Sequence, residues 1–400
     1  MTLKIINLTL KIFLLIAFFA NKSMAKSTNF VADNYFANAK INSNLFVDLI
    51  SHKSKNDLDN KREFNQTLVR ARLINNLHLN QNFIVKSQIL VNQFNHQQPN
   101  QISFLDNEGL ALQEINLNYE NKINNLTDYS FVLGKVNMDF GQGWAWNRGV
   151  WSDEISREYR QFEKIVVGSS ISRGSKRDIG RYDLSFNFFK NDRKYLDNSI
   201  FAERISATKQ DAVPGDENLF KSFNVNLKVD FDFSEKKYNQ EELHYKFGYL
   251  KSAVNKRIYN INKANPKDQS SWLAGLDYKR SLNDNISIDF LTEYVMVENF
   301  NGDADISQRY FINNMIAKYN KNINITVSNS NKMQKKLNNY TTEQNLVELS
   351  TGYEFNKNNI FDSLLLQIGY KNFRDSLKSS SSSVKEQRGL GALIRYSKNF

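Results

Sequence analysis

The sequence predicts an all-β chain that folds into one transmembrane, antiparallel up-and-down β-barrel. Three observations support this fold class: long stretches in which apolar and polar residues alternate, very few prolines, and many aromatic residues. Alternation with a period of two indicates strands that have one apolar face. Proline cannot donate to a sheet ladder, so a chain made mostly of strands must keep it in turns. We expect sixteen strands, with eighteen as the alternative.

The clearest strand pattern covers residues 223–231. Its apolar and polar positions alternate strictly as Phe223, Asn224, Val225, Asn226, Leu227, Lys228, Val229, Asp230 and Phe231. A helix would need apolar residues at i+3 and i+4, where this segment has polar side chains. About nine to eleven residues is the length that a tilted membrane strand requires. Similar patterns in residues 65–80, 271–279 and 286–296 extend the prediction along the chain.

Proline and aromatic usage favour the membrane barrel over a soluble β-sandwich. Only Pro99, Pro214 and Pro266 occur, each beside turn-forming residues. Aromatic residues make up 13% of the chain, which fits the aromatic belts of membrane barrels at both interfaces.

Residues 1–25 have the three parts of a cleaved signal peptide. Lys4 and Lys11 precede an apolar core at 12–20, and Ser23-Met24-Ala25 offers small residues for cleavage. The alternative, an anchoring helix, would need roughly 20 apolar residues. We therefore predict a signal peptide at 1–25, a short periplasmic segment at 26–41 and a transmembrane β-barrel at 42–400.

The spacing of the predicted strands alternates between short periplasmic turns and long external loops, as expected of such barrels. The last two long loops are expected at 330–345 and 372–387. Residues 199–208 break this alternation if they are counted as a spanning strand, because neither face of the segment is cleanly apolar. Placing them in a long external loop at 190–221 restores the pattern and leaves sixteen strands. A barrel of that size can enclose a water-filled lumen, whereas eight strands would be filled by side chains.

The last strand, expected at 388–400, ends on a terminal phenylalanine. Phe400 is preceded at alternate positions by Lys398, Tyr396 and Ile394. This pattern resembles the C-terminal signature of bacterial outer-membrane barrels, although Lys398 stands where that class usually has an apolar residue. The resemblance implies that Phe400, Tyr396 and Ile394 form the signal read by the barrel assembly machinery.

The third external loop, at 139–162, has a composition unlike the other loops. It holds three of the four tryptophans, namely Trp144, Trp146 and Trp151, together with three glycines and charges of both signs. Tryptophan-rich loops are costly to leave in water, so this loop should pack against another part of the protein. The approach at 135–141 looks like the strand-to-loop passage of several proteobacterial porin families.

General porins, which this architecture resembles, fold the third external loop into the barrel and narrow the pore. By that resemblance Asp153, Glu154 and Glu158 would face the lumen and form the constriction with the three tryptophans. The alternation places three bases on the inner wall opposite, namely Arg70, Arg72 and Lys86. Acids facing bases would set a transverse field across the pore. In the alternative arrangement the loop covers the rim and its charges pair locally, for example Asp153 or Glu154 with Arg157.

Charge and motifs argue against several other functions. The net charge of +11 is spread along the chain without a basic block, so nucleic acid is not an expected partner. The chain has four histidines and no cysteine, and none of the histidines has a catalytic serine or carboxylate pair at a fixed spacing. We therefore expect no enzyme activity, no metal site and no cofactor, and an adhesin is a further, weaker alternative.

The sequence thus predicts a porin of the Gram-negative outer membrane that lets small hydrophilic solutes and ions diffuse passively. The alternative is a substrate-selective channel for an anionic or sugar-like nutrient, on which the loop tryptophans would stack. Expected partners are outer-membrane lipid, lipopolysaccharide and the barrel assembly machinery. A homotrimer is expected only by analogy with general porins.

Overall fold

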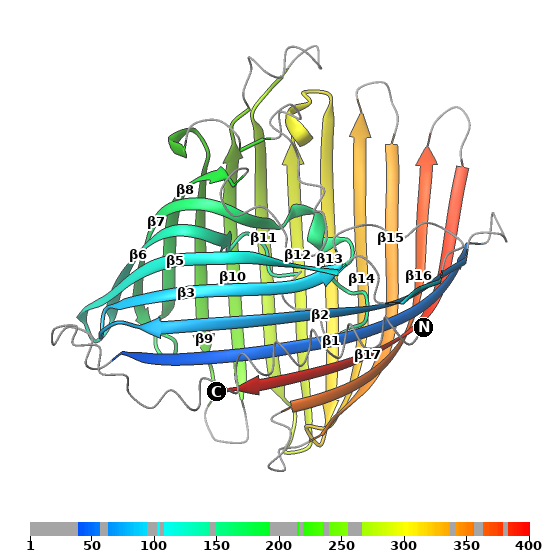
Figure 1. Cartoon of the computed structure of the whole chain (residues 1–400), viewed down its shortest axis with the longest axis horizontal. Helices are drawn as coiled ribbons and strands as arrows, with labels where there is room; N and C mark the ends of the chain where they lie inside the picture. Colours follow the sequence, from blue (N-terminus) through cyan, green and yellow to red (C-terminus); the bar gives the residue numbers. More distant parts are fainter. Residues whose placement is uncertain are drawn as a thin grey trace.

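The chain forms a β-barrel in the computed structural model (Figure 1). The structure describes residues 39–56, 63–93, 102–104, 108–143, 149–192, 214–215, 219–234, 240–254, 266–336, 341–355, 363–378 and 383–400. Within them lie the strands β1 (Lys40–Asn56), β2 (Glu63–His78), β3 (Phe83–Gln93), β4 (Ile102–Phe104), β5 (Glu108–Asn124), β6 (Thr127–Met138), β7 (Gln161–Ser175), β8 (Gly180–Asn191), β9 (Phe223–Asp232), β10 (Glu241–Ser252), β11 (Gln269–Ser281), β12 (Ile286–Glu298), β13 (Ile306–Tyr319), β14 (Ile323–Lys336), β15 (Thr341–Phe355), β16 (Ser363–Lys378) and β17 (Ser383–Asn399). Three short 3-10 helices, η2 (Ser156–Tyr159), η4 (Leu219–Lys221) and η5 (Phe300–Gly302), accompany them. Among these residues no helix is long and apolar enough to cross a membrane.

Sixteen of these strands form the closed wall, as predicted. Each wall strand pairs antiparallel with the next, and the ring closes where β1 pairs with β17 from Asn44 opposite Asn399 to Asn56 opposite Gln387. The three-residue β4 is an accessory, because it pairs in parallel with β2 while β3 pairs directly with β5. Figure 1 shows blue β1 beside red β17 at this seam.

The segment 199–208 lies outside the described residues, but its neighbours decide the strand count. β8 and β9 pair directly, from Arg181 opposite Asp230 to Phe188 opposite Phe223. The connection between them therefore contributes no strand to the wall at this point, which favours sixteen strands over eighteen.

Several wall strands are longer than the alternation predicted. The expected loops at 330–345 and 372–387 belong largely to strands, since β14 continues to Lys336 and β15 starts at Thr341. Their outer side chains at this end are polar, for example Asn331 opposite Asn345. An apolar face marks only the part of a strand that contacts lipid, so the strand beyond it was mistaken for a loop.

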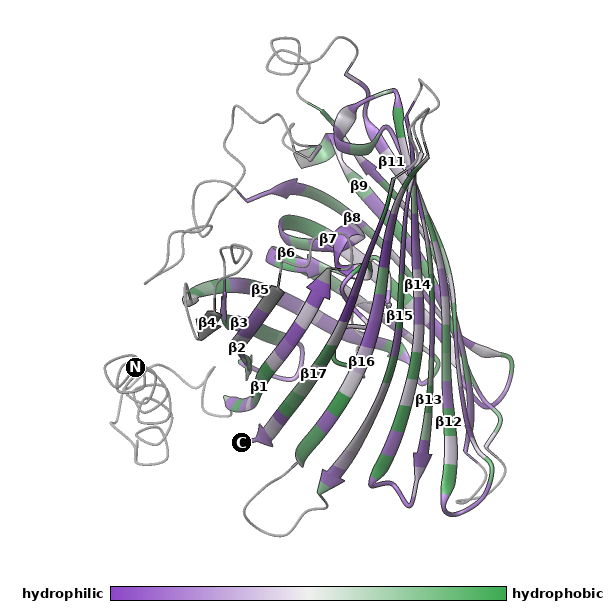
Figure 2. Ribbon diagram, turned by 90° about the vertical axis from the view of Figure 1, so that its right-hand side faces the viewer, coloured by the Kyte–Doolittle hydropathy of each residue, from purple (hydrophilic) through white to green (hydrophobic). Residues whose placement is uncertain are grey.

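The outer wall carries an apolar surface and the inner wall carries the charges. Outward side chains are strongly exposed along β15–β17, with Leu349 at 56%, Ile368 at 65% and Leu390 at 63%. On the inner face Glu293 and Glu348 are buried beneath other parts of the protein. Figure 2 shows hydrophobic and hydrophilic positions alternating along these strands. This distribution is that of a barrel that crosses a lipid bilayer.

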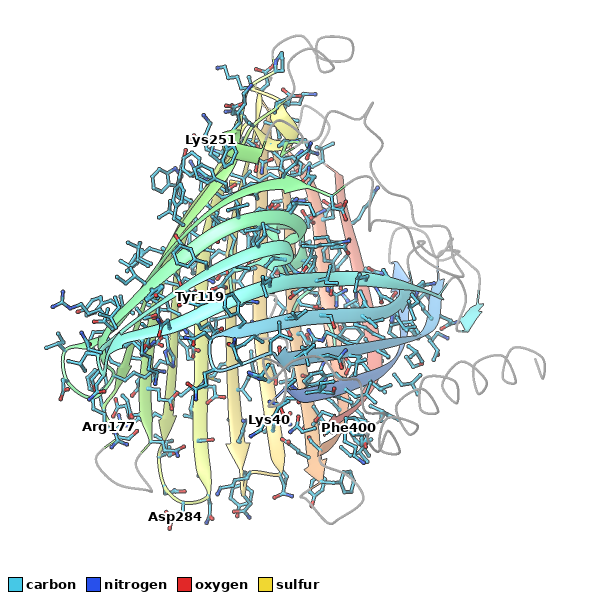
Figure 3. All side chains as sticks on the ribbon, turned by 60° about the vertical axis from the view of Figure 1, so that its left-hand side comes forward. Lys40, Tyr119, Arg177, Lys251, Asp284 and Phe400 are labelled. Atoms are coloured by element: carbon cyan, nitrogen blue, oxygen red, sulfur yellow. The ribbon has the colours of Figure 1, made fainter. Side chains whose placement is uncertain are left out.

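The two ends of the barrel differ. Short turns lie at one end, including those labelled by Arg177 and Asp284 in Figure 3, and Lys40 and Phe400 lie at the same end. Phe400 closes the seam there: its N–H donates to the carbonyl oxygen of Ser43 at 2.8 Å. In barrels of this type short turns face the periplasm, so the opposite end, near Lys251, is external.

Candidate functional site

The connection between β6 and β7, residues 139–160, turns onto the inner face of the wall (Figure 1). It is described at 139–143 and 149–160. At its start the Lys246 ammonium on β10 forms an ion pair with Asp139 and donates to the carbonyl oxygen of Gly141 at 3.3 Å. We call this segment the inner loop.

Glu293 on β12 anchors the first part of the inner loop. Its carboxylate accepts the N–H groups of Gln142 at 2.6 Å and Gly143 at 3.1 Å. It also accepts the hydroxyl of Tyr159 at the far end of the loop. Burial, together with this carboxylate, raises the pKa of Tyr159 well above its usual value, so the hydroxyl keeps its proton and remains a donor.

Glu348 on β15 anchors the middle of the inner loop in the same way. It accepts the N–H groups of Val150 at 2.5 Å and Trp151 at 3.0 Å. A Cβ atom at Gly149 would overlap this carboxylate, so the close approach requires glycine. Two buried carboxylates thus replace the water that would otherwise solvate the backbone of the loop.

Trp151 packs against the seam of the barrel. Its ring lies over Gly391 on β17, where a Cβ atom would be only 2.5 Å from the indole. The ring meets His52 of β1 edge-on at 6.3 Å, and the Lys371 ammonium lies 5.3 Å from its centre. Trp144 and Trp146 lie outside the described residues.

An apolar cluster joins the inner loop to the wall. It combines side chains of the loop with inward side chains of wall strands that are far apart in the sequence. Its members are Ile50, Met138, Phe140, Val150, Trp151, Ile155, Tyr159, Val166, Phe189, Leu250, Leu273, Val295, Val297, Tyr310, Ile312, Leu346 and Leu393. One side of the barrel interior is therefore a packed core. Burial of these side chains fixes the loop against the wall from β6 through β10 and round to β1.

The loop acids lie differently from the predicted arrangement. Asp153 does not face an open lumen: it is buried and paired with Arg157, as the local-pairing alternative described. Glu154 binds Lys371 on β16 at 2.7 Å. Glu158 binds Lys332 on β14 and accepts the Tyr310 hydroxyl at 3.2 Å. Glu154 and Glu158 thus attach the loop to lysines of β16 and β14, which are largely buried and therefore require a paired charge.

The predicted basic residues lie on the inner face of β2 and β3, next to the seam. Arg70 stands across from Asp48 in the β1–β2 register, and Asp48 is held by Arg395 at 2.7 Å. Arg72 shares this face of β2 with Arg70, and its guanidinium lies over the ring of Phe46. Lys86 lies on the same face, where it pairs loosely with Glu120 at 3.6 Å.

The inner loop adds two arginines, namely Arg157, expected only as a local partner of the loop acids, and Arg160, which the sequence did not single out. Arg70 interacts electrostatically with Arg157 and Asp153, and Arg160 interacts with Arg157, Arg70 and Arg72. Burial, and next the charge of Arg157, lowers the pKa of Arg160 to about 9, so Arg160 remains charged at neutral pH. Arg70, Arg72, Arg157, Arg160 and Arg395 thus form one group, here called the arginine cluster.

The cluster has few compensating acids. Burial alone would raise the pKa of Asp153, but the guanidinium groups of Arg157 and Arg70 hold this pKa below its usual value. Asp48 and Glu114 are the other acids that interact with the wall arginines. Within the described residues, no group of three or more histidine or acidic side chains could hold a metal ion.

The residues of the predicted assembly signal lie on the last strand. Ile394 faces outward and is 42% exposed, and Phe400 is 57% exposed. Tyr396 shares the outward face of β17, opposite Val47. Their recognition by assembly machinery remains a prediction.

The comparisons with known proteins concern the fold. The sequence matches no protein-family model and no curated protein. Among solved structures, the outer membrane channel DcaP of Acinetobacter baumannii aligns with a TM-score of 0.50 at 12% identity, covering 90% of this chain and 97% of that one. OmpT, an outer membrane protein of Vibrio cholerae, aligns at 0.47 and 10% identity, covering 93% and 100%. An anion-selective porin from Comamonas acidovorans aligns at 0.46 and 12% identity, covering 90% and 100%. At these identities the alignment with DcaP supports the barrel fold alone.

Proposed function

We propose that the chain is an outer-membrane channel through which small hydrophilic solutes and ions diffuse. The observation that carries this proposal is the inner loop, which packs on one side of a sixteen-stranded barrel and leaves polar walls on the other. A barrel of this width encloses an aqueous space unless protein fills it. DcaP, which has a similar fold, is an outer membrane channel.

The narrowest part of the channel would lie between the wall arginines of β2 and the inner loop, which carries Arg157 and Arg160. Trp144, Trp146 and Trp151, with Asp153, Glu154 and Glu158, would shape it by positioning the loop, whereas Arg70, Arg72 and Lys86 would line its wall. Guanidinium groups from both sides favour anions, since each pairs readily with carboxylate or phosphate. We therefore propose anion preference as the finer function, in place of a transverse field.

Planar-bilayer recording tests both levels of this proposal. For the channel we expect stepwise conductance in symmetric KCl. For the selectivity we expect that, under a tenfold KCl gradient, the sign of the reversal potential shows that chloride permeates better than potassium. Replacing both wall arginines, Arg70→Gln/Arg72→Gln, should reduce the anion-to-cation permeability ratio roughly thirtyfold, because each of the two nearby charges contributes about 1 kcal/mol in water.

A control of equal charge change is Lys228→Gln/Lys279→Gln. Both lysines lie on the inner face away from β2. Lys228 pairs with Asp230 of the same strand, β9, at 3.5 Å, and Lys279 of β11 pairs with Glu242 of β10 at 3.9 Å. The control should leave most of the anion preference intact. A folded protein without conductance would overturn the channel proposal and favour an enzyme or adhesin. Conductance without anion preference would overturn only the proposal of anion preference.

A homotrimer and contacts with outer-membrane lipid and the assembly machinery belong to the same proposal. Their support is the resemblance to porins in barrel architecture and in the last strand. Native mass spectrometry of the protein in detergent gives the copy number directly, and a single monomer peak would contradict the trimer.

A further inference from the structure

A row of exposed cations lies on the outer face of three adjacent strands near the seam. Arg388 on β17 stands directly opposite Lys55 on β1, and the next outward position of β1 is Lys53, opposite Leu390. Arg374 on β16 stands opposite Glu386, which pairs with Arg388 at 3.2 Å. On the other side of β1, Glu63 of β2 stands opposite Lys55. Four cations and two acids leave this patch with a net positive charge on the outside of the barrel.

The cations border a groove in the outer wall. The groove has a volume of about 370 Å³ and contains Ser51, Lys53, Thr67, Ile368, Leu390 and Ala392 among its lining residues. Its floor is apolar where β16 and β17 supply Ile368, Leu390 and Ala392. Its rim is polar: the hydroxyls of Ser51 and Thr67 lie 3.0 Å apart beside Lys53.

The groove spans the boundary between lipid-facing and polar surface. Ile368 and Leu390 are among the most exposed apolar side chains of the described residues. One register step further towards the external end, the outward positions become Arg388 and Lys55. The cations therefore lie at the depth where the outer leaflet has its headgroups, and the groove floor lies at the depth of the acyl chains.

We propose that this groove binds the phosphorylated glycolipid of the outer leaflet. A phosphate would be held by Lys53 and Arg388, with the hydroxyls of Ser51 and Thr67 available for further hydrogen bonds, while an acyl chain would lie on Ile368, Leu390 and Ala392. Charge complementarity selects this occupant, because a second copy of the same basic patch would repel it. Charge-assisted bonds to phosphate are among the strong hydrogen bonds of proteins. The proposal does not depend on conduction through the barrel.

The test uses native mass spectrometry of the chain folded in detergent and titrated with lipid A that carries two phosphates. Lys53→Gln/Arg388→Gln should weaken binding about tenfold or more, since each cation near an anionic headgroup contributes about 1 kcal/mol. Ala392→Phe should also weaken binding, because it fills the groove floor without changing charge. Heat-modifiable gel mobility verifies that each variant is folded.

The matched control is Arg309→Gln/Lys335→Gln, which removes two exposed outward cations from β13 and β14 at the same end. It should bind lipid A as the wild type does. Dephosphorylated lipid should bind weakly, and inorganic phosphate alone should not compete at the same concentration. Unchanged affinity in Lys53→Gln/Arg388→Gln, or an equal loss in the control, would overturn the proposal. A second outcome would also overturn it: the wild type is an oligomer, Lys53→Gln/Arg388→Gln dissociates that oligomer, and lipid A binding stays unchanged.

Discussion

Glu348 holds the inner loop by accepting two backbone N–H groups, those of Val150 and Trp151. Glu293 does the same for Gln142 and Gly143. Hydrogen bonds to a charged acceptor contribute about 1.5–3 kcal/mol each, and more is lost when a buried donor is left without a partner. These two side chains therefore determine the position of the loop more strongly than any exposed ion pair.

Replacing the anchor tests this directly. In Glu348→Gln the amide oxygen can keep one N–H partner, but the NH2 group faces the second N–H donor. We expect a loss of about 2–3 kcal/mol in loop attachment, seen as larger and noisier single-channel currents. The control Glu343→Gln lies on the same strand but faces outward. If the currents of Glu348→Gln are as quiet as those of the wild type, the loop is held by other contacts.

The contact between Trp151 and Gly391 permits a second steric test. In Gly391→Ala the new methyl group would lie 2.5 Å from the indole, so the tryptophan has to move, at a cost of about 1–3 kcal/mol. In Gly275→Ala the nearest atom is 3.5 Å away, so that variant should behave like the wild type. Thermal unfolding followed by gel mobility compares them, and equal midpoints would contradict the packing described here.

Acid should loosen the loop through Asp153 only at low pH. Its pKa in the folded protein lies below the ordinary value of 3.8, because Arg157 and Arg70 favour the carboxylate despite burial. A lowered pKa means that the stabilisation is present above about pH 4 and is lost as the pH falls through the folded value. Currents should stay quiet from pH 7 to 4 and become noisy below. Asp153→Asn should be noisy throughout, and a wild-type transition near pH 6 would assign the effect to another group.

Strands could be predicted from the sequence because lipid imposes a simple rule on their outer face. Segments such as 223–231 alternate strictly, and all sixteen predicted wall strands occur. The ends were harder to place, as β14 and β15 show, since beyond the lipid both faces of a strand are polar. There the alternation disappears although the hydrogen-bonded ladder continues to Lys336 and Thr341.

The course of the inner loop could not be predicted in the same way. Its tryptophans and glycines indicated packing, but the partners of Gly143 and Val150 are 150 and 198 residues away in the sequence. Nothing in an alternating strand distinguishes Glu348, which binds the loop, from an acid that faces water. The burial of Asp153 could not be predicted for the same reason, because its position depends on Arg157 and Arg70.

The last strand supports a prediction about assembly. The backbone of Phe400 exchanges two hydrogen bonds with Ser43, at 2.8 Å and 3.3 Å, which completes the seam. Deleting Phe400 should slow insertion into the outer membrane but leave the barrel able to fold in detergent, because the rest of the β1–β17 ladder remains. Phe400→Tyr keeps both backbone bonds and an aromatic ring and should assemble normally. Pulse-chase analysis of heat-modifiable mobility measures the rate, and normal assembly of the deletion would contradict the role of Phe400.

The molecule as a whole is asymmetric across its barrel. From β6 round to β1 the interior is lined by the inner loop and its apolar cluster, while the arginine cluster lies where the loop meets β2. Acids of the loop neutralise bases on the filled side, for example Glu154 with Lys371. The positive charge left near the open side is therefore a property of the assembled barrel, which the mixed charges along the strands do not reveal.

This asymmetry predicts that ion selectivity depends on salt. Fixed charges act over about 10 Å in 0.1 M salt but only about 3 Å in 1 M salt. If the arginine cluster selects anions, the chloride preference measured across a twofold KCl gradient should be strong near 0.1 M and should fall towards the ratio of free-solution mobilities near 1 M. Arg70→Gln/Arg72→Gln should flatten this dependence, whereas Lys228→Gln/Lys279→Gln should retain it. A wild-type preference that is equal at both concentrations would mean that selection comes from direct binding in a site that excludes water, since screening by mobile ions does not reach such a site.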